Sequence, residues 1–163
     1  MSKQYAIFTF RDSGPLKTWA AVRGAQIHNS REKPIAHAVN ASAPKHIVGT
    51  GNLTRDIQTR LLDHGIDPTR LRKNGVIAYE AVLTASPAFF PDFSMPGEVD
   101  LFRQWFVAQK AFLLEKYGEH RVVSLVLHAD ESTPHLHAVI LPLVHGADNR
   151  SGGRGGKGAA DAG

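Results

Sequence analysis

The alternation of apolar and polar residues divides this chain into short strands and amphipathic helices. Four segments rich in β-branched and aromatic residues predict strands, at 4–10, 75–86, 121–128 and 135–144. Apolar residues at helical spacing predict helices over 16–28, 52–65 and 98–118. Residues 29–46 hold two prolines and no sustained period, so we expect a loop there.

Residues at the ends of these segments predict how they connect. Asn52 can cap the second helix and Gly65 can end it. Only "ADESTP" separates the last two strands, which predicts a hairpin. Because helices interrupt the other strands, we expect an α/β fold of the α+β type, with helices packed on a mixed or antiparallel sheet. The third helix is expected to bury a wide stripe made of Phe102, Trp105, Phe106, Phe112 and Leu113.

Composition places the chain among folded proteins of one domain. Of its 163 residues, 42% are hydrophobic and 21% are charged. We expect one folded domain over 1–146 and a flexible glycine-rich tail over 147–163. The absence of cysteine excludes disulfides and thiolate metal sites and fits a reducing compartment. With neither a membrane-length apolar run nor a signal-peptide core, a cytoplasmic location is expected. The net charge of +4 mildly favours an anionic partner.

The hairpin segment "HADESTPHLH", residues 128–137, carries the main candidate chemistry. Side chains alternate faces along a strand, so His135 and His137 share a face. His128 ends the preceding strand, and the hairpin brings it beside them. Three imidazoles on two neighbouring strands suit a divalent metal, with open positions for water or substrate.

Two other interpretations of this segment are possible. A single histidine is more often a surface or core residue than a ligand, and the His-x-His pair alone is a weak signal. The spacing His128-x-Asp130 is also similar to the facial triad of non-haem iron oxygenases. In those proteins the distal histidine comes from a much later strand of a β-barrel, so this interpretation is disfavoured.

"HADESTPHLH" resembles the H-x-D-E-x-T-P-H-x-H motif of the plasmid mobilisation relaxases of the MobV (Pre/Mob) family, which belong to the HUH endonucleases. "HNSR", residues 28–31, is similar to the first motif of that family, H-N-x-R. "EAVLTASPAFF", residues 80–90, also fits the family pattern. The resemblance runs from about Tyr5 to Val144 and implies an antiparallel sheet of about five strands flanked by helices.

The resemblance implies a relaxase that nicks one strand at a plasmid transfer origin by metal-assisted transesterification, for plasmid mobilisation or recombination. The metal, Mn²⁺ or Mg²⁺, would be bound by three histidines. The nucleophile would form a covalent histidine–5′-phosphate intermediate, with a glutamate as its activating partner and an arginine on the DNA phosphate. The residues that match these roles are His128, His135 and His137 for the metal, and His28, Glu131 and Arg31 for catalysis.

The resemblance also implies partners and a cellular location. The expected partner is single-stranded or unwound origin DNA in the bacterial cytoplasm, with no small-molecule cofactor. It also allows for a homodimer formed through regions outside this sequence.

The chemistry of the residues leaves alternatives open. A neutral His28 can attack phosphorus through a ring nitrogen, and a carboxylate on the other nitrogen can stabilise the charge that the ring gains. Tyr5, Tyr79 and Tyr117 are rival nucleophiles, because other HUH enzymes use tyrosine. The alternative functions are a phosphoesterase that uses a metal-bound water and a DNA-binding module without catalysis.

Overall fold

In the part of the chain that the structure describes, five strands form one antiparallel sheet. The structure is a computed structural model and describes residues 6–36, 38, 42–90 and 98–143. The strand order is β1-β3-β5-β4-β2, and each neighbouring pair is antiparallel. The strands are β1 (Ala6–Phe10), β2 (Lys45–Val48), β3 (Tyr79–Ala85), β4 (Val122–His128) and β5 (His135–Ile140).

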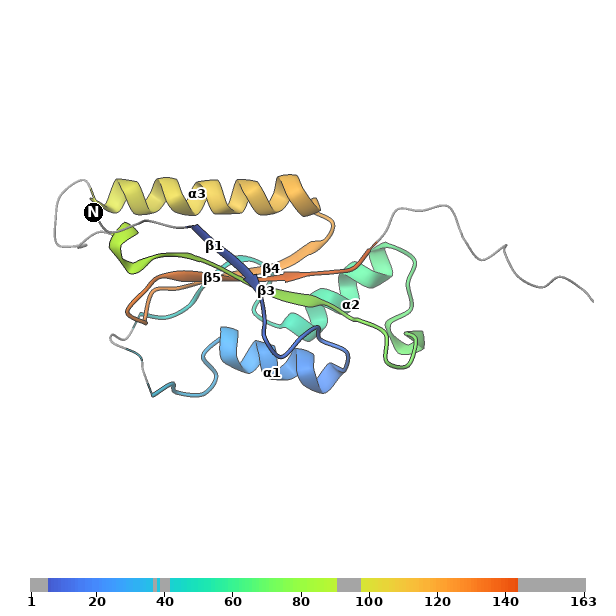
Figure 1. Ribbon diagram of the computed structural model, residues 1–163. Coiled ribbons are helices and arrows are strands. Elements are labelled where there is room, and N and C mark those ends of the chain that lie inside the picture. Colours follow the sequence, from blue (N-terminus) through green and yellow to red (C-terminus); the bar gives the residue numbers. More distant parts are fainter. Residues whose placement is uncertain (1–5, 37, 39–41, 91–97, 144–163) are drawn as a thin grey trace, which may run out of the picture.

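Three α-helices cover the two faces of the sheet. They are α1 (Trp19–Asn29), α2 (Leu53–Asp63) and α3 (Glu98–Tyr117), with short 3₁₀ turns η1 (Pro68–Arg70) and η2 (Pro87–Phe89). Figure 1 shows α3 along one face and α1 with α2 on the other. The expected antiparallel sheet with flanking helices is confirmed. None of the helices in the described ranges combines the length and apolarity that a membrane span needs.

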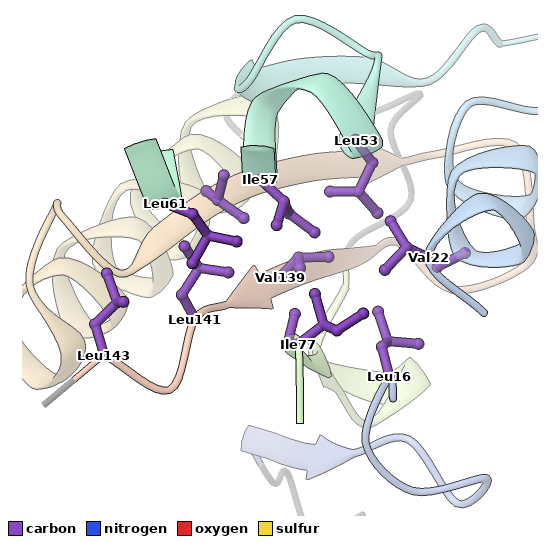
Figure 2. Packing of buried hydrophobic residues seen from close by; sticks show 12 residues of the cluster. Leu16, Val22, Leu53, Ile57, Leu61, Ile77, Val139, Leu141 and Leu143 are labelled. Carbon is purple, nitrogen blue, oxygen red and sulfur yellow. The ribbon is translucent and has the colours of Figure 1, made fainter. Parts of the chain in front are cut away.

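Apolar side chains fill most of the layer between the sheet and helices α1 and α2. Polar side chains lie at the end of this layer near the C-terminus of α1. In α2, Leu53, Ile57 and Leu61 are buried as their spacing predicts, and they pack toward Val139 of β5 (Figure 2). The side chain of Asn52 accepts a hydrogen bond from the Arg55 N–H and caps this helix, as expected. This packing fixes α1 and α2 against the sheet face on which polar residues of β3, β4 and β5 also lie.

The layer beneath α3 confirms most of the predicted stripe. Trp105 and Leu113 are buried, and Phe102 and Phe106 are partly buried against the sheet. The prediction was wrong for Phe112, which is 38% exposed. Its ring packs edge to face against Phe8 of the edge strand β1, with ring centres 5.7 Å apart.

The strand β2 was not predicted from the sequence. Residues 29–46 were expected to form a loop and no strand was expected between residues 10 and 52, whereas β2 pairs with β4. This strand has only four residues, its first two are exposed, and its register shifts between His46 and Val48. Such an edge strand carries too short an alternation for a period-two pattern to show. The predicted tail, 147–163, lies outside the described residues.

Candidate active site

The β4–β5 hairpin brings the three predicted metal ligands together. His128 at the end of β4 pairs directly with His135 at the start of β5, and Val126 pairs with His137. The ring centre of His128 lies 5.1 Å from that of His135 and 4.6 Å from that of His137. The rings of His135 and His137 are 5.1 Å apart. The three imidazoles therefore form one cluster on the sheet face that α1 covers.

The C-terminal end of α1 delivers the fourth histidine. His28 lies in its last turn, and its ring centre is 5.0 Å from that of His137 and 5.8 Å from that of His128. Donor atoms of His28, His128 and His137 lie within 4.8 Å of one another, as do those of His128, Glu131 and His135. Two overlapping sets of donors thus meet at His128. The structure brings His28 and the hairpin histidines to one place, although 99 residues separate the two segments.

Hydrogen bonds fix which nitrogen of each hairpin histidine carries a proton. His128 Nε2 lies 2.8 Å from the Asn29 carbonyl oxygen, His135 Nδ1 lies 3.0 Å from that of Thr133, and His137 Nδ1 lies 3.2 Å from Glu80 Oε1. Carbonyl and carboxylate oxygens only accept, so these three nitrogens are the donors. The remaining nitrogens, His128 Nδ1, His135 Nε2 and His137 Nε2, keep their lone pairs.

These lone pairs fit a divalent cation. His128 Nδ1 and His135 Nε2 face each other at 3.3 Å, where two lone pairs repel unless a cation lies between them. His137 Nε2 is buried and has no hydrogen-bond partner among the described residues. Histidine ligands commonly donate their second N–H to a carbonyl or carboxylate in this way, which orients the ring and raises its basicity. The donor set is therefore suited to a metal.

Sequence reasoning missed Glu80 as a residue of the site. Its side chain is 3% exposed, and besides His137 it accepts hydrogen bonds from Asn29 Nδ2 at 2.9 Å and from Arg11 at 2.8 Å. Burial alone would raise the pKa of Glu80, but the bonds from His137 and Asn29 and the charge of Arg11 outweigh it and lower the pKa to about 2. The available signal was a single acidic residue within an otherwise apolar strand.

Arg31 and Glu131 are arranged differently from the expectation. Arg31 binds Asp130 through two hydrogen bonds of 2.7 and 2.9 Å and Glu131 through a third of 2.6 Å. Among the described residues, Glu131 makes no hydrogen bond to His28, and its nearest imidazole nitrogen is His135 Nε2 at 3.8 Å. Arg31 thus joins the loop after α1 to the turn of the hairpin.

Burial favours the uncharged form of His28, His128 and His135. It lowers the pKa of His128 to about 3 and also lowers the pKa of His135. The pKa of His28 is lowered by burial and further by the neighbouring His137 and Arg31. Neutral imidazole is the form that binds a metal or attacks phosphorus, so the site favours both at neutral pH.

A groove of about 460 Å³ opens beside the histidines. His28, His135, His137 and Glu131 line one side of it. The rest of its wall comes from β1, β3, η2 and the hairpin turn, through Ile7, Val82, Thr84, Ala85, Pro87, Ser132 and Thr133. Its volume falls in the range of pockets that hold small ligands, which is enough for part of a nucleotide chain.

The rival nucleophiles that the structure describes lie elsewhere. Tyr117 is stacked with Phe8 in the layer beneath α3, on the sheet face opposite the histidines. Tyr79 lies two positions before Ala81 in β3, and Ala81 is buried beneath α3, so Tyr79 shares its α3-facing side of the sheet. Tyr5 lies outside the described residues. His28 is therefore the described candidate nucleophile that reaches the cluster.

The hairpin thus places a His-x-His pair on the central strand of the antiparallel sheet, beside a third histidine at the end of β4. The profile of the Mob_Pre family, described as plasmid recombination enzyme, matches residues 14–154. The chain belongs to this family of plasmid recombination enzymes.

Individual relatives agree with this assignment. A 65 kDa protein of Zymomonas mobilis subsp. mobilis is 30% identical over 141 residues, which are 85% of this chain and 23% of the relative. A plasmid recombination enzyme of Bacillus thuringiensis is 32% identical over 79 residues, 48% of this chain and 16% of that protein. The chain therefore spans less than a quarter of the length of either relative.

The fold matches a solved relaxase domain. The MobM relaxase domain, in a Mn-bound crystal structure with plasmid pMV158 oriT DNA, superposes with a TM-score of 0.70 over 88% of this chain and 73% of that one. The two sequences are 22% identical. A second Mn-bound structure of the same domain with oriT DNA gives a TM-score of 0.69.

Proposed function

We propose that this protein is a DNA relaxase that nicks one strand at a plasmid transfer origin by transesterification, with His28 as nucleophile. The observation that carries the proposal is the placement of a neutral His28 5.0 Å from the ring of His137, beside an open groove. The substrate would be single-stranded or unwound origin DNA. Membership of the family and the Mn-bound, oriT-bound structures of the MobM domain support this choice.

His128, His135 and His137 would hold the metal, Mn²⁺ or Mg²⁺. Three neutral ligands leave the full charge of a divalent ion available to polarise a phosphate oxygen and to stabilise the departing oxygen. The tautomers set by Asn29, Thr133 and Glu80 keep one lone pair of each ligand directed into the cluster.

His28 would form the covalent bond. One ring nitrogen attacks phosphorus, the bond from phosphorus to the 3′-oxygen breaks, and that oxygen takes a proton from solvent water and leaves as a 3′-hydroxyl. The proton on the other ring nitrogen passes to a carboxylate and from there back to solvent. The product at the 5′ side of the nick is a phosphoramidate with a neutral ring and the single negative charge of the original phosphodiester. Because the phosphorus–nitrogen bond is more reactive than the phosphodiester bond that it replaced, a free 3′-hydroxyl can attack the phosphorus and the same steps in reverse rejoin the strand.

Glu131 would be the activating carboxylate and Arg31 the phosphate-binding group. Glu131 lines the groove, and Arg31 donates a hydrogen bond of 2.6 Å to it. We therefore propose an exchange when DNA enters. Glu131 gives up its bond to Arg31 for one to His28, and the freed guanidinium N–H donates to the phosphate.

The test is nicking of a supercoiled plasmid that carries the protein's own transfer origin, with Mn²⁺ present. His28→Ala should lower the nicking rate at least about a hundredfold, because the nucleophile is lost. His46→Ala, an exposed histidine of β2, is the matched control and should nick at the wild-type rate. Nicking by His28→Ala at the wild-type rate would refute the proposal, and incorporation of ¹⁸O from water at the 5′ phosphate without an adduct would favour the phosphoesterase.

A further inference from the structure

Asn29 contacts the metal-binding cluster in two independent ways. This last residue of α1 is 3% exposed and follows His28 directly. Its carbonyl oxygen accepts the bond from His128 Nε2 at 2.8 Å. Its side-chain Nδ2 donates to Glu80 Oε1 at 2.9 Å, and the same oxygen accepts from His137 Nδ1 at 3.2 Å. One residue therefore reaches two of the three hairpin histidines.

The usual reason for asparagine at a helix end does not apply here. Asparagine is common there because it tolerates left-handed backbone geometry. In this loop the residue with positive φ is Arg31, at 52°, whereas Asn29 ends the helix without it. Its Oδ1 is buried without a hydrogen-bond partner among the described residues. Among the described residues, the side-chain amide of Asn29 makes one hydrogen bond, to Glu80. This contact is therefore the reason that we assign to an asparagine at this position.

We propose that Asn29 is a positioning residue that couples the place of the nucleophile to the orientation of the metal ligands. The carbonyl holds the ring of His128, and the amide holds the carboxylate of Glu80, which holds the ring of His137. Because His28 is the preceding residue of the same helix, any shift of the end of α1 moves the nucleophile and both ligand contacts together. The inference rests on the proposed function only in that these histidines bind the metal.

The tautomers test this arrangement in the wild-type protein. Two-bond ¹H–¹⁵N correlation spectra of the metal-free protein should show His128 protonated on Nε2 and His137 protonated on Nδ1. These assignments follow from acceptors that cannot donate. A proton on the opposite nitrogen of either ring would overturn the proposal, because Asn29 or Glu80 could not then be its acceptor. This measurement needs no variant to fold.

The coupling is tested by Mn²⁺ affinity, measured by calorimetry at a temperature where each variant is folded. Asn29→Ala should weaken Mn²⁺ binding about tenfold, as expected for loss of a contact behind a ligand. Gln26→Ala is the matched control, because this buried amide of α1 also donates to a carboxylate, that of Glu32, and among the described residues it makes no hydrogen bond to a histidine of the cluster. It should bind Mn²⁺ as the wild type does. Equal losses in the two variants would overturn the proposal.

A double-mutant cycle shows whether Asn29 acts through Glu80. In the Glu80→Gln background, Asn29→Ala should weaken Mn²⁺ binding by less than about twofold further, since the contact it supports is already altered. Two independent, fully additive effects would contradict the proposed route. Failure of the relaxase proposal would give a different result. The protein would then bind Mn²⁺ with this coupling but form no DNA adduct. In that case the proposed function would be wrong, whereas Asn29 would remain a positioning residue.

Discussion

Glu80 offers the sharpest test of how the site is held together. The carboxyl is buried and accepts from His137, Asn29 and Arg11, and its pKa is lowered from 4.5 to about 2. A shift of this size corresponds to about 3 kcal/mol of stability that depends on the ionised form. A carboxyl with a lowered folded-state pKa contributes this stability above its unfolded pKa and loses it as the pH falls through the folded value. The window therefore runs from about pH 4.5 down to about pH 2.

Glu80→Gln should remove this pH-dependent part of the stability. With the pKa values above, about 2 kcal/mol of the difference between wild type and variant disappears between about pH 6 and about pH 3. Urea unfolding of the metal-free proteins at the two pH values measures it. Glu115→Gln, an exposed glutamate of α3, is the control and should differ little from wild type at either pH. A difference for Glu80→Gln that stays constant across this range would refute the reasoning.

Three further outcomes are expected. Mn²⁺ at about 100 times its Kd should raise the free energy of unfolding by about 2.7 kcal/mol, and His135→Ala should abolish this gain in thermal denaturation; an undiminished gain would exclude His135 as a ligand. Leu136→Ala, at a fully buried position, should lower stability by about 3 kcal/mol in urea, and a loss under about 1 kcal/mol would contradict the packing beneath α3. Gly49→Ala should destabilise, because φ is +89° and the added Cβ would lie 2.8 Å from Asp56 Oδ2, whereas Gly24→Ala, with open space in α1, should stabilise by about 0.5–1 kcal/mol; the same sign for both in thermal denaturation would contradict this.

The hairpin and its histidines could be predicted because their signal is local. His128, His135 and His137 lie within ten residues, and period-two alternation alone determines which of them share a face. The proximity of His28 was not available from periodicity. It depended on the family resemblance, because only the packing of α1 beneath the sheet brings that segment to the hairpin.

The polar network around the cluster could not be predicted from sequence. The partners of Glu80 come from three other segments, at residues 11, 29 and 137, so no local pattern records them. The side chain of Arg31 likewise points toward Asp130 and Glu131, to which it is hydrogen-bonded. The backbone of Arg31 has a positive φ, which the sequence did not indicate. Both features depend on contacts between residues that are far apart in the sequence. Such contacts cannot be read from a local pattern and become visible only once the whole fold is known.

The central claim is that the ring of His28 becomes bonded to DNA phosphate. The most direct measurement incubates the protein with Mn²⁺ and a supercoiled plasmid that carries its transfer origin, digests both, and maps the peptide–nucleotide conjugate by mass spectrometry. We expect an acid-labile conjugate on the peptide that contains His28. A conjugate on Tyr5, Tyr79 or Tyr117, or Mn²⁺-dependent cleavage that leaves no conjugate, would contradict it.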